Sequence, residues 1–396
     1  MRWPVAGRPA VAARGPPVHR AHPVSTGGFR LPVDSEVMVQ TPARPHLETV
    51  LVPATPAGIR RCAAALAAGE LVAFATETVY GLGGDARSHS AVRGIFEAKA
   101  RPASDPLIVH VDGVASAAEL GELDAGSAHA RVLAEAFWPG PVTVVVPARG
   151  RLAAEVSGGP TVGLRCPAHP DALELIRTAG LPVAAPSANR FGRVSPTEAA
   201  HVLSELDGRI HWILDSGPTP LGVESTVVQC VGRRARLHRP GGVPLEELAA
   251  VLGTDALEVP DVVVTREETI AESPGTAISH YSPATPLVLT DGGPSVASAI
   301  ARELSSRGIA ARLFDLPRGD AAARELYSRL RGLDDPGDTG GVDVAVAVTV
   351  DPSGLGRAVN DRLFRAAHGH LVADAGEETI DSIERRLWSR PADSSF

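Results

Sequence analysis

Apolar stretches of strand length alternate with helical segments through most of the chain after residue 45. Residues 71–75 and 183–185 are uninterrupted apolar runs, whereas Ile59, Cys62 and Leu66 recur at helical spacing. Strands that are apolar at every position belong to a sheet that is buried on both faces. Interleaved strands and helices therefore predict an α/β fold with a largely buried sheet.

The same pattern predicts how the chain is divided. Residues 46–253 form a first α/β domain, residues 254–285 lack sustained periodicity and are typical of a linker, and residues 286–396 form a smaller doubly wound, Rossmann-like α/β domain. In this last domain the pattern predicts strands at 286–290, 309–314 and 342–350 and helices at 295–307, 320–332 and 355–368. Residues 1–45 are rich in Pro, Arg and Gly, and we expect them to be disordered. Met38 is an alternative start, so deleting residues 1–37 is expected to leave activity intact.

Charge and cysteine usage exclude several classes of protein. The formal net charge of −8 argues against a general nucleic-acid binder, but it allows a local basic pocket for a small anionic ligand. The three cysteines are far apart and form no C-x-x-C, so neither a disulfide framework nor a zinc site is indicated. A reducing, cytoplasmic setting is expected. No apolar run approaches the roughly 18 residues that a membrane span needs, so we expect no membrane partner.

Lys99 is the only lysine in the chain, and every other basic side chain except the histidines is an arginine. A site that needs a compact point charge, for example against a polyphosphate, rejects the planar guanidinium. Lys99-x-Arg101 places two cations at the predicted end of one helix, which suits the phosphates of a nucleotide. The alternative is that both simply complement the helix dipole on a solvated helix end.

Polar residues at the predicted strand ends are further candidates. Ser187 and Asn189 directly follow a strand, where α/β folds bind ligands, although turn and cap roles are an alternative. Arg165 lies inside an apolar strand and needs either an internal carboxylate or a ligand carboxylate as its partner, of which we favour the ligand. His110, flanked by aliphatic residues, is typical of a hydrogen-bonded core histidine.

Two short motifs have a structural interpretation. Residues 195–198, Ser-Pro-Thr-Glu, predict a capping box that begins a helix. Gly81-x-Gly83-x-x-Ala86 matches a dinucleotide fingerprint, but polar residues separate it from the strand and the next helix begins only near Ser90. We therefore discount the hypothesis of an NAD-linked oxidoreductase. Saturable binding of NAD would be the observation in favour of that hypothesis. P-loop, H-E-x-x-H and G-x-S-x-G motifs are absent from the sequence.

Seven short stretches occur in one order over roughly residues 50–250: 76–83, 99–102, 106–110, 138–141, 184–189, 222–226 and 239–241. Together they resemble the threonylcarbamoyl-AMP synthase family in its two-domain Sua5 form. The Ser-Pro-Gly segment at 273–275, the pair His280-Tyr281 and the smaller last domain extend the resemblance to nearly the whole chain after residue 45. The implied fold is a YrdC-like twisted, open, mixed sheet with flanking helices, followed by the smaller C-terminal domain.

The resemblance also implies a reaction, which is a nucleotidyl transfer. L-threonine, bicarbonate and ATP, with Mg²⁺ on the phosphates, give threonylcarbamoyl-AMP and pyrophosphate. The product is handed to the tRNA threonylcarbamoyl transferase machinery, which modifies an adenosine in tRNA. The alternative is a non-catalytic YrdC-like module that binds double-stranded RNA or tRNA, and steeply salt-dependent tRNA binding would favour it.

Site residues follow from the matched positions. The resemblance implies catalytic roles for Lys99, Arg101, Ser187 and Asn189, and it does not imply which residues bind the metal. It implies that ATP is contacted by Arg101, Asp105, Thr161, Ser187, Ser195, Arg239 and Ile278. It implies that threonine is contacted by Thr78, His110, Arg165, Ala185 and Ser225, with Arg165 binding the carboxylate. Asp105 departs from the family, which usually has an Asn there, and residues 277–279 lack the family's basic and aromatic residues.

Overall fold

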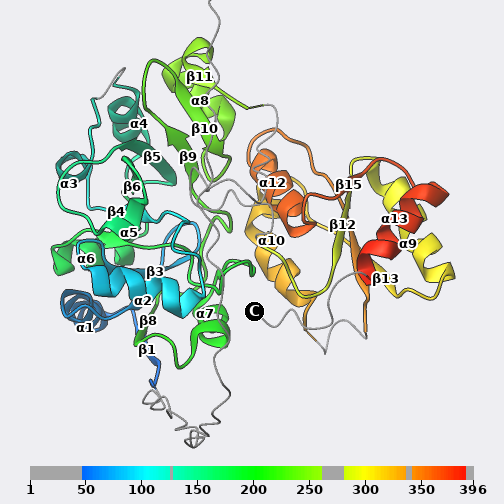
Figure 1. Cartoon of the computed structure of the whole chain (residues 1–396), viewed down its shortest axis with the longest axis horizontal. Helices are drawn as coiled ribbons and strands as arrows, with labels where there is room; N and C mark the ends of the chain where they lie inside the picture. The colour runs from blue at the N-terminus through cyan, green and yellow to red at the C-terminus, as the bar shows by residue number, and fades with distance from the viewer. Residues whose placement is uncertain (1–46, 125–127, 261–280, 336–340, 389–396) are drawn as a thin grey trace, which may run out of the picture. The chain divides into compact units, whose positions relative to one another are not determined.

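Two separate β-sheets organise the chain in the computed structural model, which describes residues 47–124, 128–260, 281–335 and 341–388 (Figure 1). We call residues 47–260 the N-terminal part and residues 281–388 the C-terminal part, and both belong to one compact unit. The expected disorder of residues 1–45 and the site residue Ile278 lie outside the described residues.

The sheet of the N-terminal part has eleven described strands in the order β1-β8-β2-β3-β7-β4-β6-β5-β9-β10-β11. Parallel and antiparallel pairs alternate irregularly along it, which confirms the predicted mixed sheet. The strands are β1 Val50–Pro53, β2 Val72–Ala75, β3 Tyr80–Asp85, β4 Ile108–His110, β5 Val142–Pro147, β6 Thr161–Arg165, β7 Val183–Ala184, β8 Trp212–Asp215, β9 Thr226–Gln229, β10 Ala235–Arg239 and β11 Leu257–Glu258. β11 lies inside the range predicted as linker and pairs with β10.

Helices cover both faces of this sheet. They are α1 Pro56–Ala67, α2 His89–Lys99, α3 Val114–Leu120, α4 His129–Phe137, α5 Ala154–Ser157, α6 Pro170–Ala179, α7 Ala199–Leu206 and α8 Leu245–Leu252, with a 3-10 turn at Thr254–Ala256. Val72 and Phe74 of β2 pack with α1 and α6, whereas Ala73 and Ala75 face the core that contains α2 and α7. Both sides of the strand are therefore buried, as its uninterrupted apolar sequence predicts.

Two local features differ from the sequence interpretation. The glycine-rich segment after residue 79, to which the sequence analysis assigns no helix or strand, is strand β3, which pairs with β2 and β7. Gly83 permits this packing, because a Cβ there would lie 2.7 Å from Cε1 of Phe74 and 2.9 Å from Cγ1 of Val183. The predicted capping box is wrong: α7 begins at Ala199, and the Ser195 hydroxyl donates to the Glu224 carboxylate instead of capping the helix.

The C-terminal part is built on a parallel sheet with the order β13-β14-β12-β15. Its strands are β12 Leu287–Thr290, β13 Ala311–Phe314, β14 Val344–Val348 and β15 Leu371–Val372, and its helices are α9 Gly293–Ser306, α10 Asp320–Gly332, α12 Gly356–Ala366 and α13 Glu377–Trp388. Leu287 and Leu289 of β12 pack with α10 and α12, whereas Val288 packs with α9 and α13. Helices thus cover both faces, which confirms the predicted doubly wound α/β arrangement.

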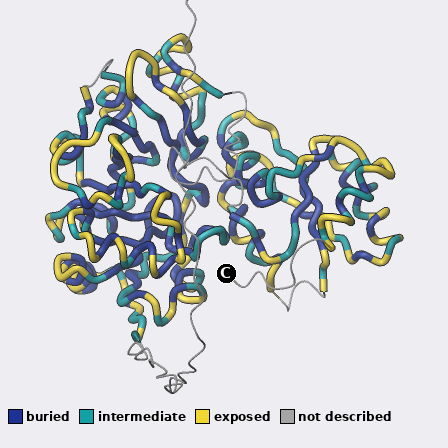
Figure 2. Tube along the Cα trace, in the orientation of Figure 1, coloured by how far each residue is buried: buried dark blue, intermediate teal, exposed yellow. Residues whose placement is uncertain are grey.

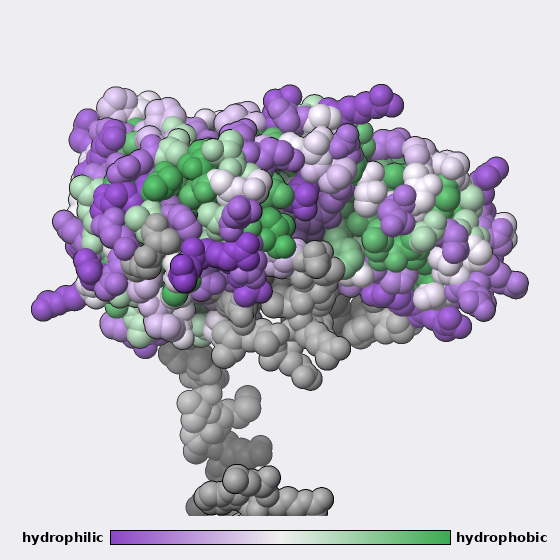
Figure 3. All heavy atoms as spheres, turned by 90° about the horizontal axis from the view of Figure 1, so that it is seen from above, coloured by the Kyte–Doolittle hydropathy of each residue, from purple (hydrophilic) through white to green (hydrophobic). Residues whose placement is uncertain are grey.

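Burial follows these layers. In Figure 2 the strands are mostly buried and the outer sides of the helices carry the exposed positions. Large exposed apolar side chains, such as Leu51 and Val132, are scattered, and on the face seen in Figure 3 hydrophilic residues surround the smaller apolar groups. Across the described ranges, every helix is too short or too polar to cross a membrane.

Candidate functional site

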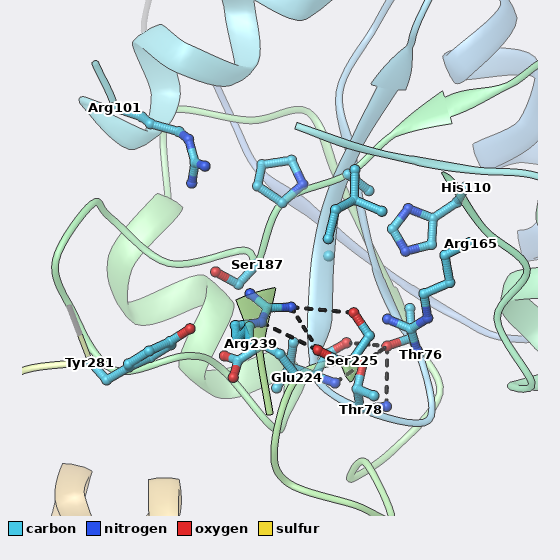
Figure 4. A pocket seen from close by; sticks show the side chains of 15 residues that line it. Thr76, Thr78, Arg101, His110, Arg165, Ser187, Glu224, Ser225, Arg239 and Tyr281 are labelled. Atoms are coloured by element: carbon cyan, nitrogen blue, oxygen red, sulfur yellow. Dashed lines mark hydrogen bonds between the residues drawn. The ribbon is translucent and has the colours of Figure 1, made fainter. Parts of the chain in front are cut away.

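Several strand ends and loops of the N-terminal part converge with Tyr281 on one pocket (Figure 4). The N-terminal part contributes the β2–β3 turn, β3, the loop after α2, β4, the end of β6, the loop after β7, the segment before β9 and the end of β10. The lining residues are Thr76, Thr78, Val79, Gly81, Arg101, Ile108, His110, Arg165, Ala185, Pro186, Ser187, Glu224, Ser225, Arg239 and Tyr281. Polar side chains from distant points in the sequence therefore meet at one place.

Eight of the residues singled out in the sequence line this pocket: Thr78, Arg101, His110, Arg165, Ala185, Ser187, Ser225 and Arg239. Lys99, Asp105, Thr161, Asn189 and Ser195 lie outside its lining. Figure 4 shows the lining divided into two groups. His110, Arg165, Thr78 and Ser225 lie on one side, and Arg101, Ser187 and Tyr281 lie on the other, with Arg239 between them.

Arg165 has an internal partner. Its Nη2 lies 2.7 Å from Oε1 of Glu77, and both side chains are almost fully buried. The Nε of Arg165 also donates to the Gly140 carbonyl at 3.4 Å, so the Trp138–Pro141 turn supports the guanidinium from behind. The structure thus shows an internal carboxylate at Arg165, while the ligand carboxylate that we favour stays a prediction.

His110 lies beside Arg165 and is buried, 3% exposed. Its ring meets Phe74 edge to face, with 6.4 Å between the ring centroids. Burial, followed by repulsion from Arg165, lowers the pKa of His110 to about 3, so the ring is neutral near pH 7. Within the described part of the chain its Nδ1 has no hydrogen-bond partner, although it lines the pocket. A neutral ring with one uncommitted nitrogen suits a polar group of a ligand rather than the fully satisfied core role.

Lys99 is buried at the end of α2 and supports the loop after β7. Its ammonium donates to the backbone carbonyl of Ser187 at 2.5 Å and to that of Asn189. Burial, followed by repulsion from Arg101, lowers the pKa of Lys99 to about 7. The predicted pair Ser187-x-Asn189 is therefore held in place by the predicted lysine. Asn189 in turn donates through its side-chain amide to the carbonyls of Arg190 and Arg193.

Arg101 and Asp105 form a buried ion pair, with 2.8 Å between Nη2 and Oδ2. The guanidinium also donates to the carbonyls of Asp105 and Pro106, at 3.3 and 3.0 Å. Burial raises the pKa of Asp105, while the positive charges of Arg101, Lys99 and Arg239 act in the opposite direction. The residue that departs from the family pattern is thus the direct partner of a predicted phosphate-binding arginine.

Arg239 and Ser225 join β10 to the start of β9. Arg239 donates to the Ser225 carbonyl, from Nε at 3.2 Å and Nη2 at 3.0 Å, and Nη2 also donates to the Ser225 hydroxyl at 3.2 Å. The hydroxyl of Thr143 is hydrogen-bonded to the same Ser225 hydroxyl, with 2.8 Å between the two oxygens. Gly241 makes this close approach feasible, because a Cβ there would lie 2.4 Å from the backbone of residues 224–226.

The remaining predicted residues are less directly connected to the pocket. Thr161 pairs with Pro147 at the far end of β6 from Arg165, and Ser195 is committed to Glu224 at 2.6 Å. Glu224 and Tyr281 are among the lining residues that had no role in the sequence interpretation. Both lie in quoted motifs, 222–226 and His280-Tyr281, so their motif positions were the available signal.

No group of three or more His, Cys, Asp or Glu side chains that could hold a metal ion occurs in the part of the chain that the structure describes. The donor set therefore does not form a dedicated metal cage. Mg²⁺ usually keeps several waters and is bound through one or two carboxylates and the phosphates of a substrate. The residues here are compatible with a magnesium ion that arrives on a nucleotide.

Comparisons with known proteins agree with this arrangement. A family model described as telomere recombination matches residues 64–241, and the model of the threonylcarbamoyl-AMP synthase C-terminal domain matches residues 243–368. The threonylcarbamoyl-AMP synthase of Bacillus subtilis is 38% identical over 334 residues, which cover 79% of this chain and 94% of the relative. That of Schizosaccharomyces pombe is 35% identical over 350 residues, covering 75% and 84%.

A solved structure is similar over the same range. The crystal structure of Pyrococcus abyssi Sua5 complexed with L-threonine has a TM-score of 0.75 and 36% sequence identity, and the match covers 82% of this chain and 99% of that one. The similarity thus includes both the N-terminal and the C-terminal part.

Proposed function

We propose that this protein, which belongs to the threonylcarbamoyl-AMP synthase family, makes threonylcarbamoyl-AMP and pyrophosphate from L-threonine, bicarbonate and ATP. The observation that carries the proposal is the convergence of Arg165, Arg101 and Arg239 on one pocket. A guanidinium is the side chain best suited to a planar carboxylate or a phosphate. The separation of the lining into two groups suits an amino acid at one end and a nucleotide at the other.

Threonine is expected to bind on the side of His110 and Arg165. Arg165 holds the threonine carboxylate while Glu77 balances part of its charge, and neutral His110 and Ser225 offer hydrogen bonds to the remaining polar groups. The neutral ring matters because it keeps a nitrogen lone pair that can accept a hydrogen bond from threonine, whereas both nitrogens of an imidazolium are donors. The amine must lose its proton before it can form the carbamate.

Two bond-forming steps then need positioning rather than a protein nucleophile. The threonine amine attacks the carbon derived from bicarbonate to give a carbamate, with loss of water. A carbamate oxygen attacks the α-phosphorus of ATP, and the bond to pyrophosphate breaks as the new bond forms. Fixed cations and donors lower the barrier to such a displacement because they stabilise the charge that develops on the phosphate oxygens.

Arg101, Ser187 and Arg239 are the residues we assign to ATP, because Arg101 and Ser187 line the other side of the pocket and Arg239 lies between the two groups. Lys99 is proposed to act next to them, as the ammonium that fixes the Ser187 loop and adds positive charge near the phosphates. Asn189 holds the same loop. The roles of Asp105, Thr161, Ser195 and Ile278 in ATP binding stay proposals from the family resemblance alone.

Several finer assignments belong to the same proposal. Magnesium would supply charge neutralisation on the ATP phosphates, bicarbonate would be the source of the carbamoyl carbon, and the reaction would take place in the cytoplasm. The product would be handed to the tRNA threonylcarbamoyl transferase machinery. The comparisons support the synthase and not the alternative of a non-catalytic module that binds double-stranded RNA or tRNA.

Release of pyrophosphate tests the proposal. The purified full chain should release pyrophosphate from ATP only when threonine and bicarbonate are both present. Serine and allothreonine, offered separately, control for the amino-acid side. Equal release without threonine would contradict the assignment.

A further inference from the structure

One carboxylate of the N-terminal part is bound mainly by side chains of the C-terminal part. Arg362 of α12 contacts Oε2 of Glu224 through Nε at 3.0 Å and Nη2 at 2.9 Å. The hydroxyl of Tyr327 on α10 donates to the same carboxylate, 2.7 Å from Oε2. Ser195 adds a hydrogen bond at 2.6 Å to Oε1. Glu224 lines the pocket, so its environment is part of the site.

Arg362 also binds a second backbone segment beside the pocket. Its Nη1 donates to the Pro240 carbonyl at 2.5 Å. Glu224 directly precedes Ser225, and Pro240 directly follows Arg239. Since Arg239 is hydrogen-bonded to Ser225, one buried guanidinium ties together both backbone segments that present these two pocket residues.

The segment that carries Glu224 also packs tightly on α10. Gly222 has a φ of +75°, and a Cβ at this position would lie 2.5 Å from the Ala323 carbonyl oxygen and 2.8 Å from Cα of Arg324. Val223 belongs to the same apolar cluster as Ala323 and Leu326. The segment therefore has little freedom to move independently of α10.

The buried pair is fully charged at neutral pH. Burial alone would raise the pKa of Glu224, but the positive charges of Arg362 and Arg239 and the hydroxyls of Ser195 and Tyr327 outweigh it and lower the pKa to about 2. Arg362 is 0% exposed. Removing one member of such a pair leaves an uncompensated buried charge, and the chain around it must rearrange.

We propose that Arg362 is a positioning residue for the substrate pocket: through Glu224 and Pro240 it fixes the segments that present Ser225 and Arg239. This inference rests on the proposed function, because it concerns the same pocket. In this proposal α10 and α12 of the C-terminal part hold the segments that present Ser225 and Arg239. The residues that line the pocket come largely from the N-terminal part.

The test compares Arg362→Met with a matched control on the same helix, Arg365→Met, in the full chain. Both arginines are buried and pair with Asp361, Arg362 at 2.9 Å and Arg365 at 3.0 Å. The two variants therefore lose that pair alike, and the contacts with Glu224 and Pro240 are those of Arg362. We expect Arg362→Met to raise the dissociation constant for threonine, measured by calorimetry without ATP, by about 10- to 100-fold, as small misplacements of site residues do. Arg365→Met should lower the melting temperature and change that constant by less than about twofold.

A double variant separates positioning from general damage. Arg362→Met together with Glu224→Gln removes the uncompensated charge, so part of the lost threonine affinity should return. If Arg362→Met does not fold, the milder variant Tyr327→Phe replaces it, because it removes only the hydroxyl that donates to Glu224. Tyr327→Phe should raise the dissociation constant for threonine by about threefold to tenfold.

Two negative results can be told apart. Threonine affinity that is unchanged in Arg362→Met, or in Tyr327→Phe, while the wild type binds threonine and releases pyrophosphate, would overturn the positioning role alone. A wild-type protein that neither binds threonine nor releases pyrophosphate would overturn the proposed function, and the inference with it.

Discussion

The N-terminal and C-terminal parts bury polar groups in different ways. In the N-terminal part, Lys99, Arg101, Arg165 and Arg239 are all buried, and three of them line one pocket. In the described residues of the C-terminal part, the buried charged side chains are Arg362 and Arg365 on one helix. Charge is costly to bury unless it is paired or meets a ligand. The contrast agrees with our proposals that the N-terminal part binds the ligands and that the C-terminal part supports their pocket.

The two sheets differ accordingly. Strand ends of the mixed sheet bring residues from distant points in the sequence to one pocket. The four-stranded parallel sheet has alternate residues facing two apolar clusters, as the residues of β12 show, and in this it resembles β2 of the larger sheet. Helices α10 and α12 pack on this apolar core and carry Tyr327 and Arg362, which bind Glu224.

The largest effect is expected from Lys99→Arg, which asks whether the N-terminal part needs an ammonium. A guanidinium is larger and cannot place one compact charge between the carbonyls of Ser187 and Asn189. We expect pyrophosphate release to fall by about 100-fold or more, with the protein still folded by circular dichroism. Arg93→Lys on the exposed face of α2 serves as the control. Near-normal turnover of Lys99→Arg would refute the point-charge argument.

A second expected loss concerns the threonine side of the pocket. Arg165→Gln removes the proposed anchor of the carboxylate and leaves Glu77 uncompensated. Threonine should bind about 10- to 100-fold more weakly in calorimetry, and the melting temperature should fall. Glu77→Gln is the matched control, because it keeps the guanidinium and should retain threonine binding. Unchanged threonine affinity in Arg165→Gln would remove Arg165 from the site.

Asp105→Asn is expected to have a smaller effect of the opposite sign. It removes a carboxylate that competes with phosphate for Arg101 while keeping an oxygen that can accept from the guanidinium. The KM for ATP should fall by about threefold to tenfold, with kcat changed less. The KM for threonine, measured in parallel, should stay constant. A raised KM for ATP would instead give the carboxylate a positive role.

The stability of the fold should also depend on pH, independently of any ligand. The pKa of His110 is about 3 in the folded chain, below the ordinary value of 6.5, so the unfolded chain binds the extra proton between these two pH values. Stability from this group is therefore complete above about pH 6.5 and is lost as the pH falls towards 3. Between pH 6.5 and 4.5 the loss should be about 2 kcal/mol. His110→Gln should lose correspondingly less stability over that interval in urea unfolding, and an identical loss would show that another group titrates.

The sequence was most informative where apolar periodicity decides the structure. The strands at 71–75 and 183–185 follow from it, as do α9, α10 and α12 among the four described helices of the C-terminal part, because helices and strands bury apolar residues at different spacings. Strand β3 was not predicted, since its glycines lower strand propensity, and their close contact with Phe74 and Val183 is visible only in three dimensions.

The sequence predicted individual residues of the candidate site but not which residues contact each other. Arg165, a charged residue in an apolar strand, indicated a buried partner, yet nothing local identifies Glu77 as that partner. Ser195 matched a helix cap by spacing, and a carboxylate far along the chain, Glu224, competes for it. Contacts of Arg362 with Glu224 and Pro240 join segments more than 100 residues apart, which one sequence cannot reveal.

The central claim is that one pocket joins threonine, bicarbonate and ATP. The most direct measurement is to incubate the full chain with carbon-labelled bicarbonate, threonine and ATP and to analyse the adenylate product. We expect label in a threonine-containing adenylate that forms at the same rate as pyrophosphate and is absent when threonine is omitted. Pyrophosphate release that leaves the adenylate unlabelled would contradict it.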